Sequence, residues 1–419
     1  MRSFLRRGLP LSPAKRVRQS SIAPVATPTD LADLTRNAVD VLPTGRLEEQ
    51  LASGRPLRVK LGIDPTTPDI HLGHTVVLEK LREFQAAGHR VVLIVGDFTA
   101  RVGDPSGRSA QRPLPSPEEI EANAATYQEQ AFKVLDRERT EVRFNSEWLR
   151  MAPEALLGLL AQTTVARLIE RDDFQKRLAA GAPIAALELL YPLLQGYDSV
   201  AVEADVEIGG TDQKFNLLFG RDVQAAYGQQ PQSILTLPIL VGTDGERKMS
   251  KSLGNYVGVT DAPEEMFGKV MRVPDEAMAG YYRLVLGAEP PAGPPNEAKR
   301  KLARGVVERF HDAAGATRAE QRFDRLFVER RAPDEVEELD LGPFASGNGE
   351  MVHLPQLMAE AFGISSSEAR RLIGQGGAKL DGEPIPPDTL DLDPAELDGR
   401  VLQAGKRRFR RLRVVPGHG

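Results

Sequence analysis

The chain has 419 residues, 41 % of them hydrophobic, which is enough for two or three domains with sizeable cores. Its net charge of −5 excludes a uniformly basic nucleic-acid binder, so any such activity must come from a local patch. The sequence has no cysteine, which excludes disulfides and thiolate chemistry, and no apolar run has the length of a membrane span.

The N-terminal segment is basic. Its first 18 residues carry six basic and no acidic side chains, and they lack the sustained apolar stretch of a secretory signal. A transit peptide is one interpretation. We favour a disordered extension over residues 1–30, or a start codon placed too far upstream, because residues 20–30 are rich in Ser, Pro and Thr.

From about residue 57, short apolar segments alternate with helical ones. We expect strands at 57–62, 90–96 and 140–145, with helices at 73–88 and 117–135 between them. This alternation predicts an α/β fold, with a Rossmann-like parallel-sheet catalytic domain over residues 31–260. Ligands of such sheets bind beyond the carboxyl ends of the strands, where Asp64 follows the first strand and Asp97 and Asp104 follow the second.

Two further domains are expected after the sheet. Residues 261–345 have a helical composition with charges throughout, which predicts an α-helical domain. Residues 351–415 predict a small α+β domain with a basic surface suited to an RNA backbone, although a charged solvent-facing surface would look similar. The candidate RNA contacts are Arg370, Arg371, Lys379, Lys406, Arg407, Arg408 and Arg410.

His71 and His74 bracket Gly73 where the first long helix should begin. A helix N-terminus has unpaired N–H groups and a positive dipole end, and both suit phosphate. The imidazoles could donate hydrogen bonds to developing charge, and Gly73 would leave room for a nucleotide. A metal site would need a third ligand, and none of the other four histidines has an obvious partner, so we expect no metal.

The segment Lys248-Met249-Ser250-Lys251-Ser252 follows a glycine-rich turn and an apolar run. Two lysines three residues apart, with hydroxyl groups beside them, suit a polyphosphate. We interpret the segment as a loop that stabilises a leaving pyrophosphate in the transition state. A solvated surface loop would have a similar composition.

Two other segments have the composition of a ligand site. Tyr191, Gln195 and Asp198 share one face of a helix, where the phenol and amide could hold an amino group and Asp198 a distal hydroxyl. The segment 208–213 places Gly210 and Asp212 at a strand-to-helix corner, where an acidic side chain could bind both ribose hydroxyls.

Taken together, these motifs resemble a known family. The sequence His71-Leu72-Gly73-His74 followed by Lys248–Ser252 is similar to the paired signatures of class I aminoacyl-tRNA synthetases. The segments 62–66, 103–107, 191–198 and 209–213 narrow the resemblance to bacterial tyrosyl-tRNA synthetases, and residues 351–415 resemble an S4-type RNA-binding domain.

The resemblance implies tyrosine activation with ATP and Mg²⁺, without a tightly bound cofactor, followed by transfer to tRNA(Tyr) in a cytoplasmic homodimer. It implies a role for each matching position. Tyrosine would contact Asp104, Tyr191, Gln195, Asp198 and Gln213. ATP would contact Gly62, Asp64, His71, Gly73, His74, Gly210, Asp212, Lys248, Met249, Ser250 and Lys251. The catalytic groups would be Thr66, His71, His74, Lys248 and Lys251.

One position departs from the family pattern. Lys60 stands where many members have a tyrosine that helps to recognise the substrate hydroxyl. Either Asp198 acts with another partner or Lys60 points elsewhere. A tryptophanyl-tRNA synthetase, a nucleotidyltransferase of the same fold and a catalytically silent RNA-binding protein are the alternatives to tyrosine activation.

Overall fold

The structure is a computed structural model that describes residues 31–66, 68–105, 116–328, 336–344, 351–405 and 408–414. The chain forms two compact units. The first holds the residues up to Ala262 together with Lys269–Asp312, and the second holds Pro263–Gly268 together with the residues from Ala313 onward. The domain boundaries expected from the sequence stay a prediction, and the segment 1–30 lies outside the described residues.

The first unit contains a six-stranded sheet in the order β1-β6-β5-β2-β3-β4. Its neighbouring strands are parallel except for β1, which pairs with β6 in the antiparallel direction. The three strands expected at 57–62, 90–96 and 140–145 are β2, β3 and β4, which confirms the α/β fold. The strands are β1 Asp40–Leu42, β2 Arg58–Ile63, β3 Arg90–Val95, β4 Thr140–Phe144, β5 Val206–Gly210 and β6 Ser233–Leu237.

The strand order reverses between β2 and β5. From β2 the chain runs outward through β3 to β4, then returns to β5 and continues outward on the other side to β6. Crossovers between parallel strands are right-handed, so α3 and α10, which follow β2 and β5, cover opposite faces. Sheets of this kind have a crevice beyond the carboxyl ends of the strands where the order reverses.

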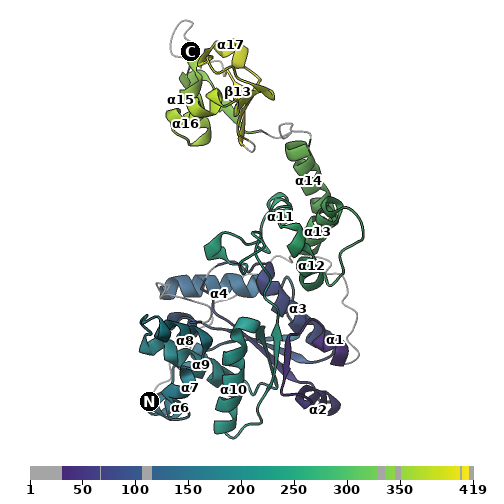
Figure 1. Ribbon diagram of the computed structural model, residues 1–419, viewed down its shortest axis with the longest axis vertical. Coiled ribbons are helices and arrows are strands. Elements are labelled where there is room, and N and C mark those ends of the chain that lie inside the picture. Colours follow the sequence, from purple (N-terminus) through teal and green to yellow (C-terminus); the bar gives the residue numbers. More distant parts are fainter. Residues whose placement is uncertain are drawn as a thin grey trace, which may run out of the picture. The chain divides into compact units, whose positions relative to one another are not determined.

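Helices surround this sheet in the first unit (Figure 1). They are α1 Leu31–Thr35, α2 Arg46–Ala52, α3 Leu72–Ala86, α4 Pro117–Ala131, α5 Ser146–Leu149, α6 Pro153–Leu160, α7 Val165–Leu168, α8 Asp172–Ala179, α9 Ala186–Ala201 and α10 Lys214–Ala226. Two further helices of this unit, α12 Met278–Tyr281 and α13 Pro295–Phe310, pack against each other. The helix α11, Pro263–Val270, contains residues of both units.

The packing of helices against the sheet and against each other fixes the helices whose polar residues face the crevice. The apolar residues of β3 from Val91 to Val95 are all buried, as expected for a strand covered on both faces. The helices α9 and α10 approach closely at Gly196, where a Cβ atom would lie 2.7 Å from Cγ2 of Val223. Glycine is therefore needed there to let the two helices pack.

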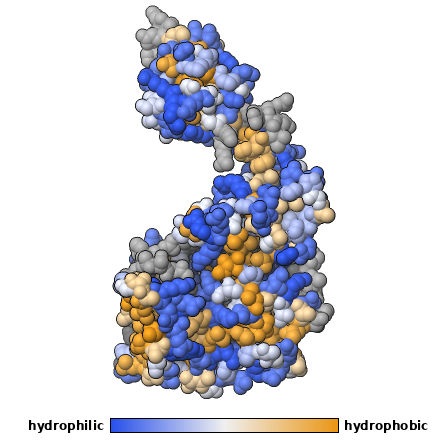
Figure 2. Space-filling model, in the orientation of Figure 1, coloured by the Kyte–Doolittle hydropathy of each residue, from blue (hydrophilic) through white to orange (hydrophobic). Residues whose placement is uncertain are grey.

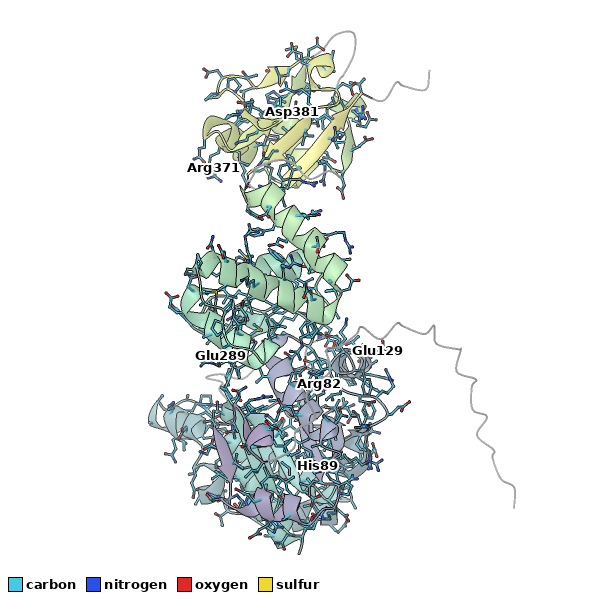
Figure 3. All side chains as sticks on the ribbon, turned by 90° about the vertical axis from the view of Figure 1, so that its right-hand side faces the viewer. Arg82, His89, Glu129, Glu289, Arg371 and Asp381 are labelled. Carbon is cyan, nitrogen blue, oxygen red and sulfur yellow. The ribbon has the colours of Figure 1, made fainter. Side chains whose placement is uncertain are left out.

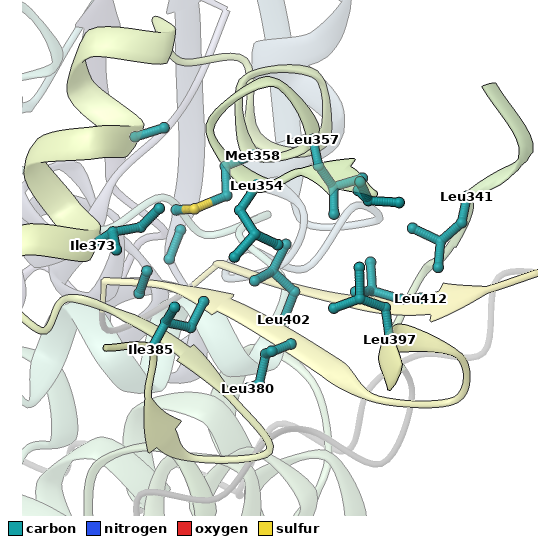
Figure 4. Packing of buried hydrophobic residues seen from close by; sticks show 14 residues of the cluster. Leu341, Leu354, Leu357, Met358, Ile373, Leu380, Ile385, Leu397, Leu402 and Leu412 are labelled. Carbon is teal, nitrogen blue, oxygen red and sulfur yellow. The ribbon is translucent and has the colours of Figure 1, made fainter. Parts of the chain in front are cut away.

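The second unit has a five-stranded sheet in the order β10-β9-β12-β13-β7 and a two-stranded sheet of β8 and β11. Its core places Leu354 and Met358 of α15 and Ile373 of α16 against Leu402 and Leu412 of the sheet (Figure 4). Its elements are α14 Ala313–Phe323, β7 Glu338–Asp340, β8 Val352–His353, α15 Leu354–Phe362, α16 Ser366–Gly374, β9 Ala378–Leu380, β10 Glu383–Pro384, β11 Asp391–Leu392, α17 Pro394–Leu397, β12 Val401–Ala404 and β13 Arg408–Arg413.

Among the described residues, no helix combines the length and the apolar character needed to cross a membrane.

A buried ion pair joins the two strands at which the order reverses. Lys60 of β2 and Glu207 of β5 are partners in register, with Nζ and Oε1 2.8 Å apart and side chains 0 % and 1 % exposed. Lys60 also donates to Oγ of Ser199 at 2.9 Å and to the carbonyl of Gln195 at 3.1 Å, both on α9. The pair therefore ties α9 to the centre of the sheet.

Replacing Glu207 with alanine is expected to lower the free energy of unfolding by about 3–5 kcal/mol, because Lys60 would keep a buried charge without its partner. Denaturant unfolding followed by the fluorescence of Trp148, the only tryptophan in the sequence, measures this change. Glu289→Ala is a matched control, because its ion pair with Arg283 is exposed at both side chains (Figure 3). The control should cost less than about 1 kcal/mol, and equal losses in both variants would contradict the anchoring role.

Candidate active site

A cavity of about 710 Å³ lies at the carboxyl ends of the strands. Segments that are far apart in the sequence meet around it. All the residues that the sequence analysis assigned to an amino acid, a nucleoside or phosphates line it, although their individual roles stay predictions. They are Gly62, Asp64, Thr66, His71, Gly73, His74, Asp104, Tyr191, Gln195, Asp198, Gly210, Asp212, Gln213, Lys248, Met249, Ser250 and Lys251.

Asp198 of α9 is a deeply buried carboxylate of the cavity, with 3 % of the residue exposed. Its Oδ1 accepts a hydrogen bond from Nε1 of Trp148 at 2.8 Å, and its Oδ2 accepts one from Nδ2 of Asn145 at 3.3 Å. Burial raises the pKa of Asp198 to about 6, while the nearby charge of Lys60 and these two hydrogen bonds act in the opposite direction. The carboxylate keeps lone pairs for a ligand hydroxyl.

A second carboxylate, Asp64, follows β2 at the switch in strand order. It accepts hydrogen bonds from the hydroxyl of Tyr191 at 2.9 Å and from Oγ1 of Thr99 at 2.6 Å. The pKa of Asp64 is raised to about 7, chiefly by burial and also by the charges of Asp104 and Asp198, while the hydrogen bonds from Thr99 and Tyr191 act in the opposite direction. Carboxylates so close together disfavour their own ionised forms, and a bound cation would relieve this repulsion.

Two amide side chains complete this part of the cavity. Gln195 donates from Nε2 to Glu207 at 3.1 Å, and its Oε1 is buried without a hydrogen-bond partner among the described residues. Gln213 donates from Nε2 to Asp104 at 2.8 Å. The free amide oxygen beside several carboxylates is an acceptor that suits a ligand ammonium group.

His71 and His74 stand at the N-terminus of α3 with their rings stacked 3.8 Å apart. Nδ1 of His71 accepts from the N–H of Gly73 at 3.2 Å, and Nδ1 of His74 accepts from the N–H of His71 at 3.3 Å. Because each Nδ1 is an acceptor, the proton of each neutral ring lies on Nε2. Both rings can therefore donate through Nε2 to a ligand in the cavity.

Burial keeps both imidazoles neutral. It lowers the pKa of His71 well below its ordinary value and the pKa of His74 to about 4, with the charge of Lys248 acting in the same direction. The sequence explained Gly73 by the approach of a nucleotide. The structure adds a second reason, because a Cβ atom there would lie 3.0 Å from the His71 ring.

The segment 248–252 forms part of the cavity wall. Nζ of Lys248 lies 3.4 Å from Oδ2 of Asp212, and Lys251 forms an ion pair with Asp69. Asn255 holds the segment at its base, because its Oδ1 accepts from the N–H of Ser250 at 2.8 Å and its Nδ2 donates to the carbonyl of Lys248 at 3.1 Å. The two cationic groups are about half to one-third exposed.

The structure answers the question that Lys60 raised. Its ammonium is completely buried against Glu207 and does not reach the oxygens of Asp198 at hydrogen-bonding distance. The partners of Asp198 are instead Trp148 and Asn145, which the sequence analysis missed. Thr99 was missed as well. All three follow the ends of β3 and β4, so the rule that drew attention to Asp64 could have found them.

The candidate RNA contacts do not form one surface in the described part of the second unit. Arg408 and Arg410 lie opposite the core residues Ala404 and Leu402, so they share the helix-covered face of the sheet. Lys379 alternates with core residues on β9 and so lies on the other face. Arg370 and Arg371 are exposed on α16 (Figure 3). Lys406 and Arg407 lie outside the described residues.

The comparisons with known proteins agree with one another. Residues 52–328 match the family described as "tRNA synthetases class I (W and Y)". The chain is 50 % identical over 397 residues to the tyrosine–tRNA ligase of Moorella thermoacetica, covering 90 % of this chain and 94 % of that protein. It is also 50 % identical over 399 residues to the Haemophilus influenzae tyrosine–tRNA ligase, covering 92 % of this chain and 97 % of that protein.

Solved structures show the same fold. The tyrosyl-tRNA synthetase of Archaeoglobus fulgidus, complexed with L-tyrosine, aligns with a TM-score of 0.55 at 24 % identity and covers 68 % of this chain and 97 % of that one. The Aspergillus nidulans mitochondrial tyrosyl-tRNA synthetase, truncated at its C-terminus, aligns with a TM-score of 0.57 at 22 % identity over 71 % of this chain and 93 % of that one. The family match and the identity to the bacterial relatives place the chain in the tyrosine–tRNA ligase family of the class I tRNA synthetases.

Proposed function

We propose that this chain activates L-tyrosine with ATP, forming tyrosyl-adenylate and pyrophosphate, and then transfers tyrosine to tRNA(Tyr). One observation supports the proposal: a single cavity is lined by the deeply buried carboxylate of Asp198 and by the two imidazoles and two ammonium groups of His71, His74, Lys248 and Lys251. An amphipathic amino acid and a nucleoside triphosphate could therefore react in the same space.

The first step needs no protein nucleophile. The carboxylate of tyrosine attacks the α-phosphorus of ATP in line, a new C–O–P linkage forms, and the bond to the β-phosphate oxygen breaks as pyrophosphate leaves. Negative charge grows on the phosphate oxygens, where Nε2–H of both histidines and the two lysine ammonium groups can stabilise it. Catalysis then rests on positioning and charge stabilisation.

The substrate ammonium fits the anionic side of the cavity. Asp64 and Asp104 supply negative charge, Gln195 supplies the unpaired amide oxygen, and Tyr191 holds Asp64 in place. The phenol would then reach Asp198, whose two oxygens are oriented by Trp148 and Asn145. Asp212 and Gly210 would face the ribose, and Thr66 the phosphates.

Mg²⁺ would enter with the triphosphate, whose oxygens and water molecules are the ligands that this ion prefers. Among the described residues, no three histidine, cysteine or carboxylate side chains converge as a ligand set. The metal would neutralise phosphate charge when bound.

A homodimer and a cytoplasmic location are further proposals from the family. A dimer is supported by exposed apolar side chains on the helices from α6 to α9, among them Leu157 and Val165, which are each 64 % exposed, together with Leu178 and Leu187. Figure 2 shows hydrophobic residues gathered on the side of the first unit where α6 to α8 lie. Covering this surface with a second copy would remove it from water. The basic side chains of the second unit support tRNA as a partner.

Exchange of labelled pyrophosphate into ATP, measured with each of the twenty amino acids, tests the reaction. We expect exchange with tyrosine and attachment of tyrosine to tRNA(Tyr). Exchange only with tryptophan would identify the other branch of the family. Exchange without an amino acid would indicate a nucleotidyltransferase, and no exchange would indicate a silent RNA-binding protein.

The assignment of Asp198 to the substrate hydroxyl gives a second prediction. In the wild-type enzyme, phenylalanine would leave this buried carboxylate without the hydroxyl donor, at a cost of about 1–3 kcal/mol or more for a charged group. Asp198→Ala is expected to reduce the preference for tyrosine over phenylalanine in adenylate formation at least tenfold. Asp97→Ala is the matched control, because Asp97 accepts from the N–H of Ser146 and does not line the cavity within the described residues. An unchanged preference in Asp198→Ala would remove Asp198 from the hydroxyl site.

A further inference from the structure

Asp69 has no role in the site described so far, yet it is the partner of Lys251. It lies two residues before His71, in the loop between β2 and α3. Its side chain is 30 % exposed and that of Lys251 is 35 % exposed, so the pair is only partly open to water. The contact joins residues 182 positions apart in the sequence.

The backbone on both sides of Asp69 is firmly held. The carbonyl of Pro68 accepts hydrogen bonds from Gln130 at 2.7 Å and Thr126 at 3.0 Å, both on α4. The N–H of Ile70 donates to Gln130 at 2.7 Å, and the carbonyl of Ile70 accepts from Val259 at 3.0 Å. Asp69 is therefore a fixed point, whereas Lys251 carries its charge on a long flexible stem.

The ion pair of Asp69 and Lys251 is also placed so that Lys251 can bind a ligand while it stays paired with Asp69. Lys251 lines the cavity, and Asp69 is not among the described residues that do. An ammonium group has three N–H donors, so it can keep one on Asp69 while others point at a phosphate oxygen. Lys248 differs, because its partner Asp212 lines the cavity and faces the proposed ribose position. Nucleotide binding would separate Lys248 from Asp212 and would leave the pair of Lys251 and Asp69 intact.

We propose that Asp69 is a positioning residue that holds the ammonium of Lys251 at the edge of the cavity, ready for the leaving pyrophosphate. This inference rests on the proposed function. A lysine side chain loses much of its rotamer freedom when it is fixed, and this loss costs free energy. With Asp69 in place, the side chain of Lys251 is already ordered before the transition state is reached. The entropic cost of ordering it therefore does not reduce the stabilisation of charge in the transition state.

Single-turnover formation of tyrosyl-adenylate tests the proposal in four forms of the full-length protein: wild type, Asp69→Ala, Lys251→Ala and the double variant. Asp69→Ala is expected to slow adenylate formation about tenfold. The affinity for tyrosine, followed by Trp148 fluorescence, should not change. In the Lys251→Ala background, removing Asp69 should change the rate less than twofold, because the two residues act as one unit.

Two further variants separate positioning from folding and from general charge effects. Asp69→Glu keeps a carboxylate and should recover part of the rate, whereas Asp69→Asn should stay slow. Asp275→Ala removes another aspartate–lysine pair, with Lys299, in which neither residue lines the cavity within the described part, and should leave the rate unchanged.

The inference is overturned if Asp69→Ala or Asp69→Asn reacts at the wild-type rate or faster, or if the losses in the double variant multiply. These outcomes differ from failure of the proposed function, in which the wild-type protein itself would form no adenylate from tyrosine.

Discussion

The carboxylate of Asp198 is the constraint on which the site depends. A charge removed from water is costly unless hydrogen bonds replace its hydration. Here Trp148 and Asn145 supply those bonds, and each can do so only because it follows the end of β4 at the same edge of the sheet. These hydrogen bonds continue beyond Asp198, because Asn145 also donates to Thr99 at 2.9 Å, and Thr99 donates to Asp64. One hydrogen-bond chain therefore spans the two buried carboxylates.

Charge is distributed unevenly over the cavity. Asp64, Asp104 and Asp198 make its inner part anionic, whereas the lysine segment and the N-terminus of α3 make the outer part favourable to anions. The histidines contribute as neutral donors, because burial and the nearby lysine disfavour their protonation. In the proposed function, this distribution would orient an amino acid with its ammonium on the anionic side of the cavity and its carboxylate toward the α-phosphorus.

Much of the fold and site could be predicted from the sequence. The strands that begin near residues 57, 90 and 140 are apolar segments that lie between helical segments. The local sequence pattern was therefore enough to predict them. The motif residues converge because parallel strands end at one edge, which the sequence also indicated. The burial of Lys60 against Glu207 could not be predicted, because it depends on which strands are neighbours where the order reverses. The position of Trp148 after a strand end could have been noticed, but its hydrogen bond to Asp198 and the ion pair of Asp69 with Lys251 join segments far apart in the chain, and no local pattern marks these partners.

The position of Lys379 on the face of the sheet opposite to Arg408 and Arg410 could not be predicted for the same reason. Composition showed a basic segment, but the side of a sheet on which a residue lies depends on register, and register appears only once the strands are paired. The sequence of a short basic strand therefore predicts that a surface is charged, but it does not predict which face of the sheet each basic side chain occupies.

The central claim is that one cavity holds the tyrosine side chain at Asp198 and the triphosphate at His71, His74 and Lys251. A crystal structure of the protein with tyrosine and a non-hydrolysable ATP analogue tests it most directly. We expect the phenol oxygen within hydrogen-bonding distance of Asp198, and phosphate oxygens within reach of Nε2 of the histidines. A tyrosine ring bound away from Asp198, or phosphates directed away from α3, would contradict it.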